Sequence, residues 1–158
     1  MSIVYLSLGS NMGNRESVLT LSIEEIGKRI GNVTKVSSKY ETEPWGFISA
    51  NKFINMAIEV DTELSPQEVS KRVHKIEDDL GRIRSDNVSG YEDRVIDIDI
   101  LMIDNIISEE KDLTLPHPKM HLREFVIFPL CEIAADIIHP ILGCSIEEIK
   151  TKMINKPL

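Results

Sequence analysis

Residues 94–102, RVIDIDILM, alternate branched apolar side chains with aspartate, which is the period-two pattern of a β-strand. Strands disfavour aspartate, so two of them in one strand require a reason. Side chains two residues apart lie on the same face, and a rise of roughly 3.3 Å per residue puts Asp97 and Asp99 about 7 Å apart at the backbone. The apolar positions are expected to face a core behind the carboxylates: Ile96, Ile98 and Ile100. The chain must therefore build a sheet that carries two neighbouring carboxylates on one face.

Patterns along the rest of the chain predict more strands and helices. Strands are expected over residues 4–8, 33–40 and 53–60. A first helix is indicated by apolar residues near helical spacing: Val18, Leu21, Ile26 and Ile30. A second helix begins with Ser65 as N-cap and Pro66 at its first position, and Glu68 completes a capping box. The apolar face of this helix is formed by Val69, Val73, Ile76 and Leu80, and Gly81 ends it.

Two further helices are expected near the C-terminus, around residues 125–135 and 145–153. The resulting order is βαββαβ followed by helices. This order predicts an α+β fold, a ferredoxin-like sandwich with an antiparallel-dominated sheet, helices on one face and extra C-terminal helices. A length of 158 residues without repeats or linkers predicts a single domain over residues 1–158.

Composition narrows the classes of partner and compartment. A net charge of -8 disfavours nucleic acid, because affinity for a phosphate backbone comes from cationic surface. The N-terminus has no basic segment before its short apolar run, and no apolar run reaches about 18 residues, so we expect a soluble cytoplasmic protein without a membrane partner. Cys131 and Cys144 lack metal-ligand spacing and are expected to be reduced thiols, with a disulfide as the weaker alternative.

The aspartate pair has two interpretations. Adjacent carboxylates repel each other unless a cation lies between them, and Mg²⁺ binds a few carboxylates together with waters and substrate phosphates. The alternative is a half-buried strand whose outer face is acidic. Leu101 and Ile103 are expected on the same face as the acids, which suggests a cleft rim rather than a wet surface.

Several cations gather near this strand in an otherwise acidic chain: Arg82, Arg84, Arg94 and Arg123. Arginine forks match phosphate oxygens, so together these residues predict an anion site, although each taken singly is more typical of a weak surface salt bridge. Glu77 is interpreted either as an exposed helix acid or as an acid that orients an arginine or a metal-bound water. His117, in the segment LTLPHPKMH, is expected to hydrogen-bond a phosphate or hydroxyl, or else to be a satisfied structural histidine.

A second group of residues suits a flat ligand. Phe53 and Asn55 share one strand face, so a ring and an amide lie side by side, as stacking on a heterocycle and hydrogen bonding to it require. Core aromatics with an amide at the edge are the alternative. Residues 9–14, GSNMGN, follow a strand but match neither the Walker A nor the GxGxxG pattern, so a tight turn with helix caps is expected there.

Seven segments together resemble the 6-hydroxymethyl-7,8-dihydropterin pyrophosphokinases of folate biosynthesis: YLSLGSN, YETEPWG, FINMAIEV, IEDDLGRIR, RVIDIDIL, LTLPHPKM and REFVIFPL. The combination of RVIDIDIL with LTLPHP carries most of the specificity. The resemblance implies a ferredoxin-like enzyme that transfers the β,γ-diphosphate of ATP to the pterin hydroxymethyl oxygen and leaves AMP. It also implies two Mg²⁺ ions, ATP as co-substrate and a small pterin as the acceptor. We expect a monomer.

Carried over position by position, the resemblance assigns roles to individual residues. The metal ligands are Asp97 and Asp99, which are catalytic together with Arg82 and Arg94. The ATP-binding residues are Glu77, Arg82, Arg84, Arg94, Ile100, Thr114, His117 and Arg123. The pterin-binding residues are Thr42, Pro44, Trp45, Phe53, Asn55, Asp97 and Phe125. Asp97 is also the closest candidate to accept the proton of the pterin hydroxyl.

The chain departs from the family pattern at three places. Residues 91–94 read YEDR where members usually have Trp-Gly-Pro-Arg, Glu43 stands where proline often follows the pocket threonine, and Asp112 replaces a basic residue before LTLPH. These changes bear on loop closure and ATP affinity. Two other functions stay open from the residues alone, a noncatalytic small-ligand sensor and a different Mg²⁺-dependent phosphotransferase or hydrolase.

Overall fold

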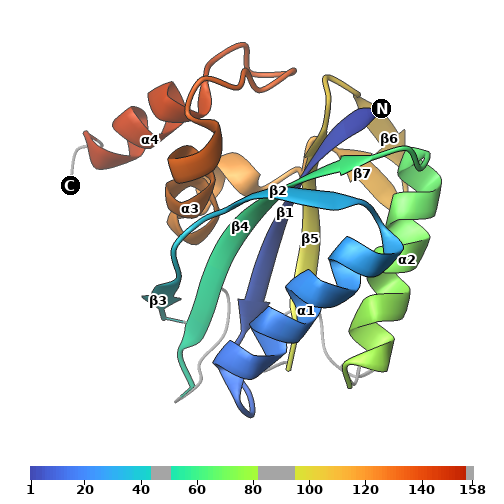
Figure 1. The fold of residues 1–158 in the computed structure, drawn as a ribbon. Coiled ribbons are helices and arrows are strands. Elements are labelled where there is room, and N and C mark those ends of the chain that lie inside the picture. Colours follow the sequence, from blue (N-terminus) through green and yellow to red (C-terminus); the bar gives the residue numbers. More distant parts are fainter. Residues whose placement is uncertain (44–50, 82–94, 156–158) are drawn as a thin grey trace.

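The structure is a computed structural model that describes residues 1–43, 51–81 and 95–155 (Figure 1). Its strands are β1 (Ser2–Ser10), β2 (Asn32–Val36), β3 (Tyr40–Thr42), β4 (Phe53–Thr62), β5 (Asp97–Ile103), β6 (Ser108–Glu110) and β7 (Leu113–Leu115). Its helices are α1 (Arg15–Arg29), α2 (Pro66–Asp79), α3 (Glu124–Ala134) and α4 (Ile146–Ile154), with a short 3₁₀ turn at Met120–Leu122.

The main sheet has the strand order β2-β4-β1-β5, and β3 also pairs with β4. Every pairing in it is antiparallel, because α1 connects β1 to β2 and α2 connects β4 to β5 by crossovers that each skip one strand. This is the order of a ferredoxin-like sandwich, so the predicted fold class is confirmed. The order leaves β5, which carries the two aspartates, at one edge of the main sheet.

The two faces of the sheet are covered by different helices (Figure 1). On one face, α1 and α2 pack on a core that includes Leu6, Ile58 and Ile98. On the other face, α3 and α4 pack on a second core around Tyr5, Ala57 and Met102. The expectation of helices on one face therefore holds for α1 and α2, and the C-terminal helices bury the opposite face, where the carboxylates of β5 also lie.

The bulge in β5 corrects one sequence prediction. Tyr5 pairs with Met102 and Leu6 pairs with Ile100, so Leu101 is an extra residue in the strand. Leu101 lies on the face of the aspartates, as expected, but the bulge turns Ile103 to the opposite face, where it joins the core under α1 and α2. The alternation of side chains therefore changes phase just beyond the carboxylates.

Other predicted elements need smaller corrections. The expected strand over residues 33–40 is two strands, β2 and β3. Between them, the Ser37 backbone N–H donates to the Ala57 carbonyl, and the Ser37 hydroxyl, rather than a backbone carbonyl, accepts from the Ala57 N–H. In α1, Leu19 is buried and Leu21 is 46% exposed. Of the predicted capping box at α2, the structure forms one hydrogen bond, from the Glu68 backbone N–H to the Ser65 hydroxyl. The Glu68 carboxylate accepts from Arg72 Nε instead of completing the box.

The β6–β7 hairpin was not expected from the sequence. The segment after β1 partly follows the expectation of a capped turn, since Asn14 caps α1, but Gly9 and Ser10 still belong to β1.

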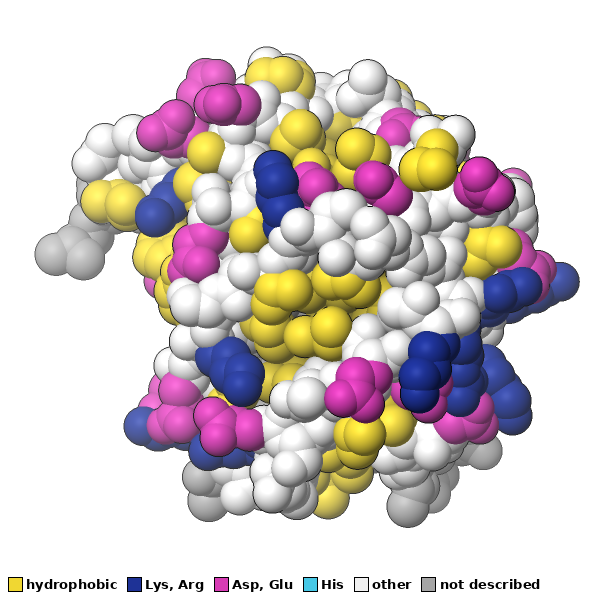
Figure 2. Space-filling view, viewed as in Figure 1, with side chains coloured by type: hydrophobic (Ala, Val, Ile, Leu, Met, Phe, Trp, Pro, Cys, Tyr) yellow, Lys and Arg dark blue, Asp and Glu magenta, His cyan; other side chains and the backbone are white. Residues whose placement is uncertain are grey.

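Cys131 and Cys144 are free thiols. None of the helices in the described ranges is long and apolar enough to cross a membrane. Figure 2 shows acidic and basic side chains interspersed around a hydrophobic hollow on one face of the molecule.

Candidate active site

The two carboxylates lie on the part of the edge strand β5 that pairs with β1. Asp97 pairs with Gly9 of β1, and Gly9 pairs on its other side with Asn55 of β4. Directly opposed residues of antiparallel strands point to the same face, so Asn55, Gly9 and Asp97 form one row across three strands. The next row contains Ala57, Ser7 and Asp99. The amide of β4 and the carboxylate of β5 therefore flank a position that has no side chain.

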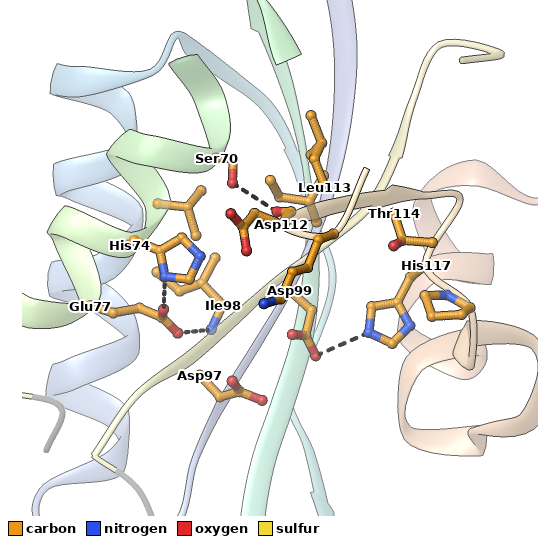
Figure 3. Close-up of a pocket in the computed structure, with 14 residues that line it drawn as sticks. Ser70, His74, Glu77, Asp97, Ile98, Asp99, Asp112, Leu113, Thr114 and His117 are labelled. Carbon is orange, nitrogen blue, oxygen red and sulfur yellow. Dashed lines mark hydrogen bonds and ion pairs between the residues drawn. The ribbon is translucent and has the colours of Figure 1, made fainter. Parts of the chain in front are cut away.

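Glu77 secures the edge strand from the side of α2 (Figure 3). Its side chain is only 2% exposed, and one carboxylate oxygen accepts a hydrogen bond from the backbone N–H of Ile98 at 2.8 Å. The other carboxylate oxygen lies 3.8 Å from His74 Nδ1, one turn earlier in α2. The interpretation of Glu77 as an exposed helix acid is wrong, because the side chain is buried against the residue that separates the two aspartates.

His117 and Arg123 approach Asp99 from the opposite side. The Asp99 carboxylate lies 4.0 Å from His117 Nε2 and 3.9 Å from Arg123 Nη1. Burial, followed by the charge of Arg123, lowers the pKa of His117 to about 4, so the imidazole is neutral at pH 7. The backbone N–H of Lys119 donates to His117 Nδ1, which places the remaining imidazole proton on Nε2, facing Asp99. A neutral N–H donor and a guanidinium thus converge beside one carboxylate.

A pocket of about 350 Å³ lies along the outer edge of β5. Its lining combines residues of α2, β5 and the β6–β7 hairpin, and Figure 3 shows the carboxylates of Asp97 and Asp99 on the side of β5 that faces His117. The expected nucleotide residues Glu77, Ile100, Thr114 and His117 all line it. The hairpin is held against α2 by a hydrogen bond from the Ser70 hydroxyl to the Asp112 carbonyl, at 3.3 Å.

The metal prediction is consistent with the donor set. Among the residues that the structure describes, no group of three or more His, Cys, Asp or Glu side chains is arranged to hold a metal alone. Mg²⁺ does not need such a cage, since it is typically held by one or two carboxylates, several waters and substrate phosphates. The pair Asp97 and Asp99, half-buried at a pocket edge, fits an ion that arrives with a phosphate ligand.

The second group of expected residues lies beyond Gly9. The Asn55 amide donates to the Thr42 hydroxyl at 2.6 Å, and Thr42 pairs with Phe53 across β3 and β4. A Cβ added to Gly9 would stand 2.8 Å from Asn55 Oδ1 and 3.6 Å from the Phe53 ring. The ring, amide and hydroxyl predicted to hold a heterocycle therefore border the bare backbone of β1.

Phe125 lies in the first turn of α3, two residues after the buried Arg123, whose guanidinium is 5.7 Å from the ring centroid. Because α3 packs on the sheet face that carries Asn55 and the aspartates, Arg123 and Phe125 belong to that face.

Two departures from the family pattern lie in the described residues. Glu43 Oε1 lies 3.5 Å from Lys52 Nζ. Asp112, another departure, lines the pocket beside Lys111, so a cation is retained in the same hairpin turn.

Six residues with predicted or related roles lie outside the described ranges: Pro44, Trp45, Arg82, Arg84, Tyr91 and Arg94. The sequence analysis, in turn, missed residues that the structure brings to the site. Gly9 is the clearest, because it was assigned to a tight turn after a strand over residues 4–8, whereas β1 runs to Ser10 and puts a glycine inside a strand, which marks a close approach to the backbone. Ser70 and His74 had no signal, because their place in the pocket depends on how α2 packs against β5.

A family model described as 7,8-dihydro-6-hydroxymethylpterin-pyrophosphokinase (HPPK) matches residues 5–135, which include both groups of site residues. The chain belongs to this family. The 2-amino-4-hydroxy-6-hydroxymethyldihydropteridine pyrophosphokinase of Porphyromonas gingivalis is 44% identical over 141 residues, covering 89% of this chain and 95% of the relative. The enzyme of the same name from Aquifex aeolicus is 36% identical over 157 residues, covering 99% and 96%.

These relatives confirm the predicted HPPK family and its reaction, the ATP-dependent transfer of a diphosphate group to hydroxymethyldihydropterin in folate biosynthesis. Solved structures agree on the fold. Wild-type HPPK-DHPS of Plasmodium falciparum with pteroate has a TM-score of 0.79 at 13% identity, covering 98% of this chain and 45% of that one. An HPPK-DHPS crystal structure in complex with substrates has a TM-score of 0.75 at 14% identity. The present chain spans less than half the length of these two solved chains.

Proposed function

We propose that this HPPK chain binds its two substrates on either side of Asp97, with ATP along the edge of β5 and 6-hydroxymethyl-7,8-dihydropterin over Gly9. The observation that supports the proposal is the row Asn55, Gly9, Asp97, in which an amide and a carboxylate lie on one sheet face on either side of a glycine. The hydroxymethyl group of a pterin hydrogen-bonded to Asn55 would extend toward Asp97, where the triphosphate would end.

Asp97 and Asp99 would hold two Mg²⁺ ions together with the triphosphate. When bound, the ions neutralise phosphate charge and orient the β-phosphate for in-line attack. The protein contributes a rigid carboxylate pair, because β5 pairs with β1 on one side and Ile98 is bonded to Glu77 on the other.

The nucleotide would be held by residues around the pocket at the edge of β5. His117, with its Nε2 proton, and Arg123 would donate to phosphate oxygens beside Asp99. Thr114 would contact the ribose region and Ile100 the adenine, while Glu77 fixes the strand that carries both metal ligands. Arg82, Arg84 and Arg94 are proposed as further phosphate ligands from the sequence alone, with Arg82 and Arg94 stabilising charge during transfer.

The pterin would lie against Phe53 and Phe125 and would hydrogen-bond to Thr42 and Asn55, with Pro44 and Trp45 completing the pocket. Asn55 is 4% exposed, and its NH₂ group donates to Thr42, which leaves its carbonyl oxygen to accept from the heterocycle. A pterin carries adjacent N–H donors on its pyrimidine ring, so a fixed amide oxygen selects this edge.

Positioning and electrostatics would dominate the chemistry. The pterin hydroxymethyl oxygen attacks the β-phosphorus, the bond from that phosphorus to the oxygen bridging to the α-phosphorus breaks, and AMP leaves with the bonding electrons. The hydroxyl proton would pass to Asp97, the carboxylate in the row with Asn55 and Gly9. Arginine side chains and the His117 N–H would stabilise the charge that develops on the phosphate oxygens.

We also propose that residues 1–158 form one pyrophosphokinase domain that acts as a monomer in the cytoplasm, with small-molecule substrates as its partners. The family match over residues 5–135 supports the single domain, and the two free cysteines support a reducing compartment.

Product analysis tests the proposed function. Purified protein is mixed with MgATP and 6-hydroxymethyl-7,8-dihydropterin, with each substrate omitted in turn. AMP and pterin diphosphate should form only in the complete mixture. ADP or inorganic phosphate as the main product would indicate a different phosphotransferase or a hydrolase, and pterin binding without AMP formation would indicate a sensor.

A further inference from the structure

Glu132, in the last turn of α3, joins two parts of the chain that are more than 90 residues apart in sequence. One carboxylate oxygen accepts from the Ser38 backbone N–H at 2.9 Å. The other accepts from the hydroxyls of both Ser38 and Tyr40. These hydrogen bonds hold the pKa of Glu132 below its ordinary value, so the carboxylate stays ionised and accepts from all three donors at neutral pH.

The contact reaches the proposed pterin pocket through β3. Tyr40 begins this strand and pairs with Asn55, and Thr42 ends it and pairs with Phe53. Opposed residues share a face, so the Tyr40 side chain lies on the same side of the sheet as the pocket residues. The Thr42 hydroxyl accepts from the Asn55 amide, so displacement of β3 would move the hydrogen bond that orients Asn55.

The contact reaches the other wall of the pocket through α3. Phe125 and Glu132 are seven residues apart in one continuous helix, which is about two turns and brings both side chains to nearly the same side. The N-terminal end of α3 also carries Arg123, 3.9 Å from Asp99. Phe125 and Glu132 belong to the same 11-residue helix, so holding Glu132 against β3 restrains the position of Phe125 relative to that strand.

We propose that Glu132 is a positioning residue for the pterin pocket, which it acts on by clamping α3 to β3 through Ser38 and Tyr40. This inference rests on the proposed pterin pocket. Glu132 sets the separation between the wall that carries Phe125 and the wall that carries Thr42, Phe53 and Asn55. It does not touch the reacting atoms. Its effect is expected to be larger on pterin binding, which uses both clamped walls, than on ATP binding, for which the only proposed ligand carried by α3 is Arg123 at its N-cap.

Steady-state kinetics of Glu132→Ala and Tyr40→Phe test the clamp. Glu132→Ala should raise KM for the pterin by about tenfold, the equivalent of about 1.4 kcal/mol, while KM for ATP changes less than about twofold. Tyr40→Phe removes one of the three hydrogen bonds and should have a smaller effect in the same direction. The double variant should be no worse than Glu132→Ala, because both substitutions break the same contact.

Two control variants separate positioning from general loss of stability. Glu148→Ala breaks the capping box of α4 without touching β3, so it should lower the melting temperature and leave KM for the pterin unchanged. Lys35→Ala removes a hydrogen bond between β2 and the Ile133 carbonyl of α3, again without touching β3. If Glu132→Ala behaves like these controls, with lower stability and an unchanged KM for the pterin, the clamp is overturned.

Thr42→Ala and Asn55→Ala distinguish failure of the clamp from failure of the proposed pocket. If both variants raise KM for the pterin and Glu132→Ala does not, the pocket stands and the clamp is wrong. If neither variant changes KM for the pterin, the pocket assignment is wrong, and the proposed role of Glu132 in positioning that pocket is wrong as well. A rise in all three supports the clamp.

Discussion

The carboxylate of Glu77 accepts a hydrogen bond from the backbone N–H of Ile98, the residue that separates Asp97 from Asp99. The bond occupies the outer edge of β5, where a strand at the end of a sheet would otherwise present its N–H to solvent. A buried acid on α2 thereby fixes the backbone that carries both proposed metal ligands.

Glu77→Ala should therefore affect both stability and ATP use. Loss of the acceptor leaves a buried N–H without its partner, which costs about 1–3 kcal/mol of unfolding free energy. KM for ATP should rise, and Glu77→Gln should restore most of both losses because its amide oxygen can accept the same bond. Chemical denaturation and steady-state kinetics measure the two effects. Glu68→Ala, on the same helix, removes an exposed ion pair and should change stability by less than about 0.5 kcal/mol.

Removing the charge of either aspartate should stop turnover without unfolding the protein. Asp97→Asn and Asp99→Asn keep side-chain shape, and each should lower kcat by about a hundredfold or more and shift the Mg²⁺ titration to higher concentration. Asp104→Asn is a matched control at the end of the same strand, because asparagine tolerates its positive φ of 48° and can still accept from Ile3 N–H. Turnover within a few-fold of wild type for either site variant, at saturating Mg²⁺, would show that the metal assignment is wrong.

Gly9→Ala should impair pterin binding specifically. The new Cβ would stand 2.8 Å from Asn55 Oδ1, so the amide must move away from its place beside Thr42. KM for the pterin should rise by about tenfold or more, with a smaller change for ATP. Gly27→Ala is the control, since its Cβ meets nothing within 4 Å and a helical Gly→Ala change should stabilise by roughly 0.5–1 kcal/mol. An unchanged KM for the pterin in Gly9→Ala would refute the proposed position of the heterocycle.

His139 predicts a pH dependence of stability away from the site. Burial, followed by the neighbouring His121, lowers the pKa of His139 from its ordinary 6.5. Its Nδ1 accepts from the backbone N–H groups of Ile141 and Leu142, so protonation there would break both hydrogen bonds. The unfolded chain therefore takes up the proton first, and stability should be unaffected above about pH 6.5 and fall as the pH drops below it.

Urea denaturation of wild type and His139→Asn at pH 7.5 and 5 measures this effect, with asparagine retaining an acceptor for the two N–H groups. Wild type should lose more stability between the two pH values than the variant does. Equal losses would mean that His139 does not contribute. His74→Asn, whose side chain is 61% exposed, should follow wild type.

Local sequence patterns determined much of the secondary structure of this protein. The period-two alternation of residues 94–102 predicted a strand with Asp97 and Asp99 on one face, and Ser65 with Pro66 predicted the start of α2. The order of the elements predicted the ferredoxin-like sheet. These features depend on side-chain direction and capping within a few residues, which the chain specifies before any tertiary contact forms.

Tertiary structure decided how these elements form a site. Asn55, Gly9 and Asp97 belong to three strands, and only the pairing register places them in one row. The bulge at Leu101, the burial of Glu77 and the hydrogen bonds of Glu132 likewise have no local signal, because each depends on a partner brought close by packing. A sequence specifies which way a side chain points along its own element, whereas the group it meets is fixed only when separate elements pack and their buried polar atoms find partners.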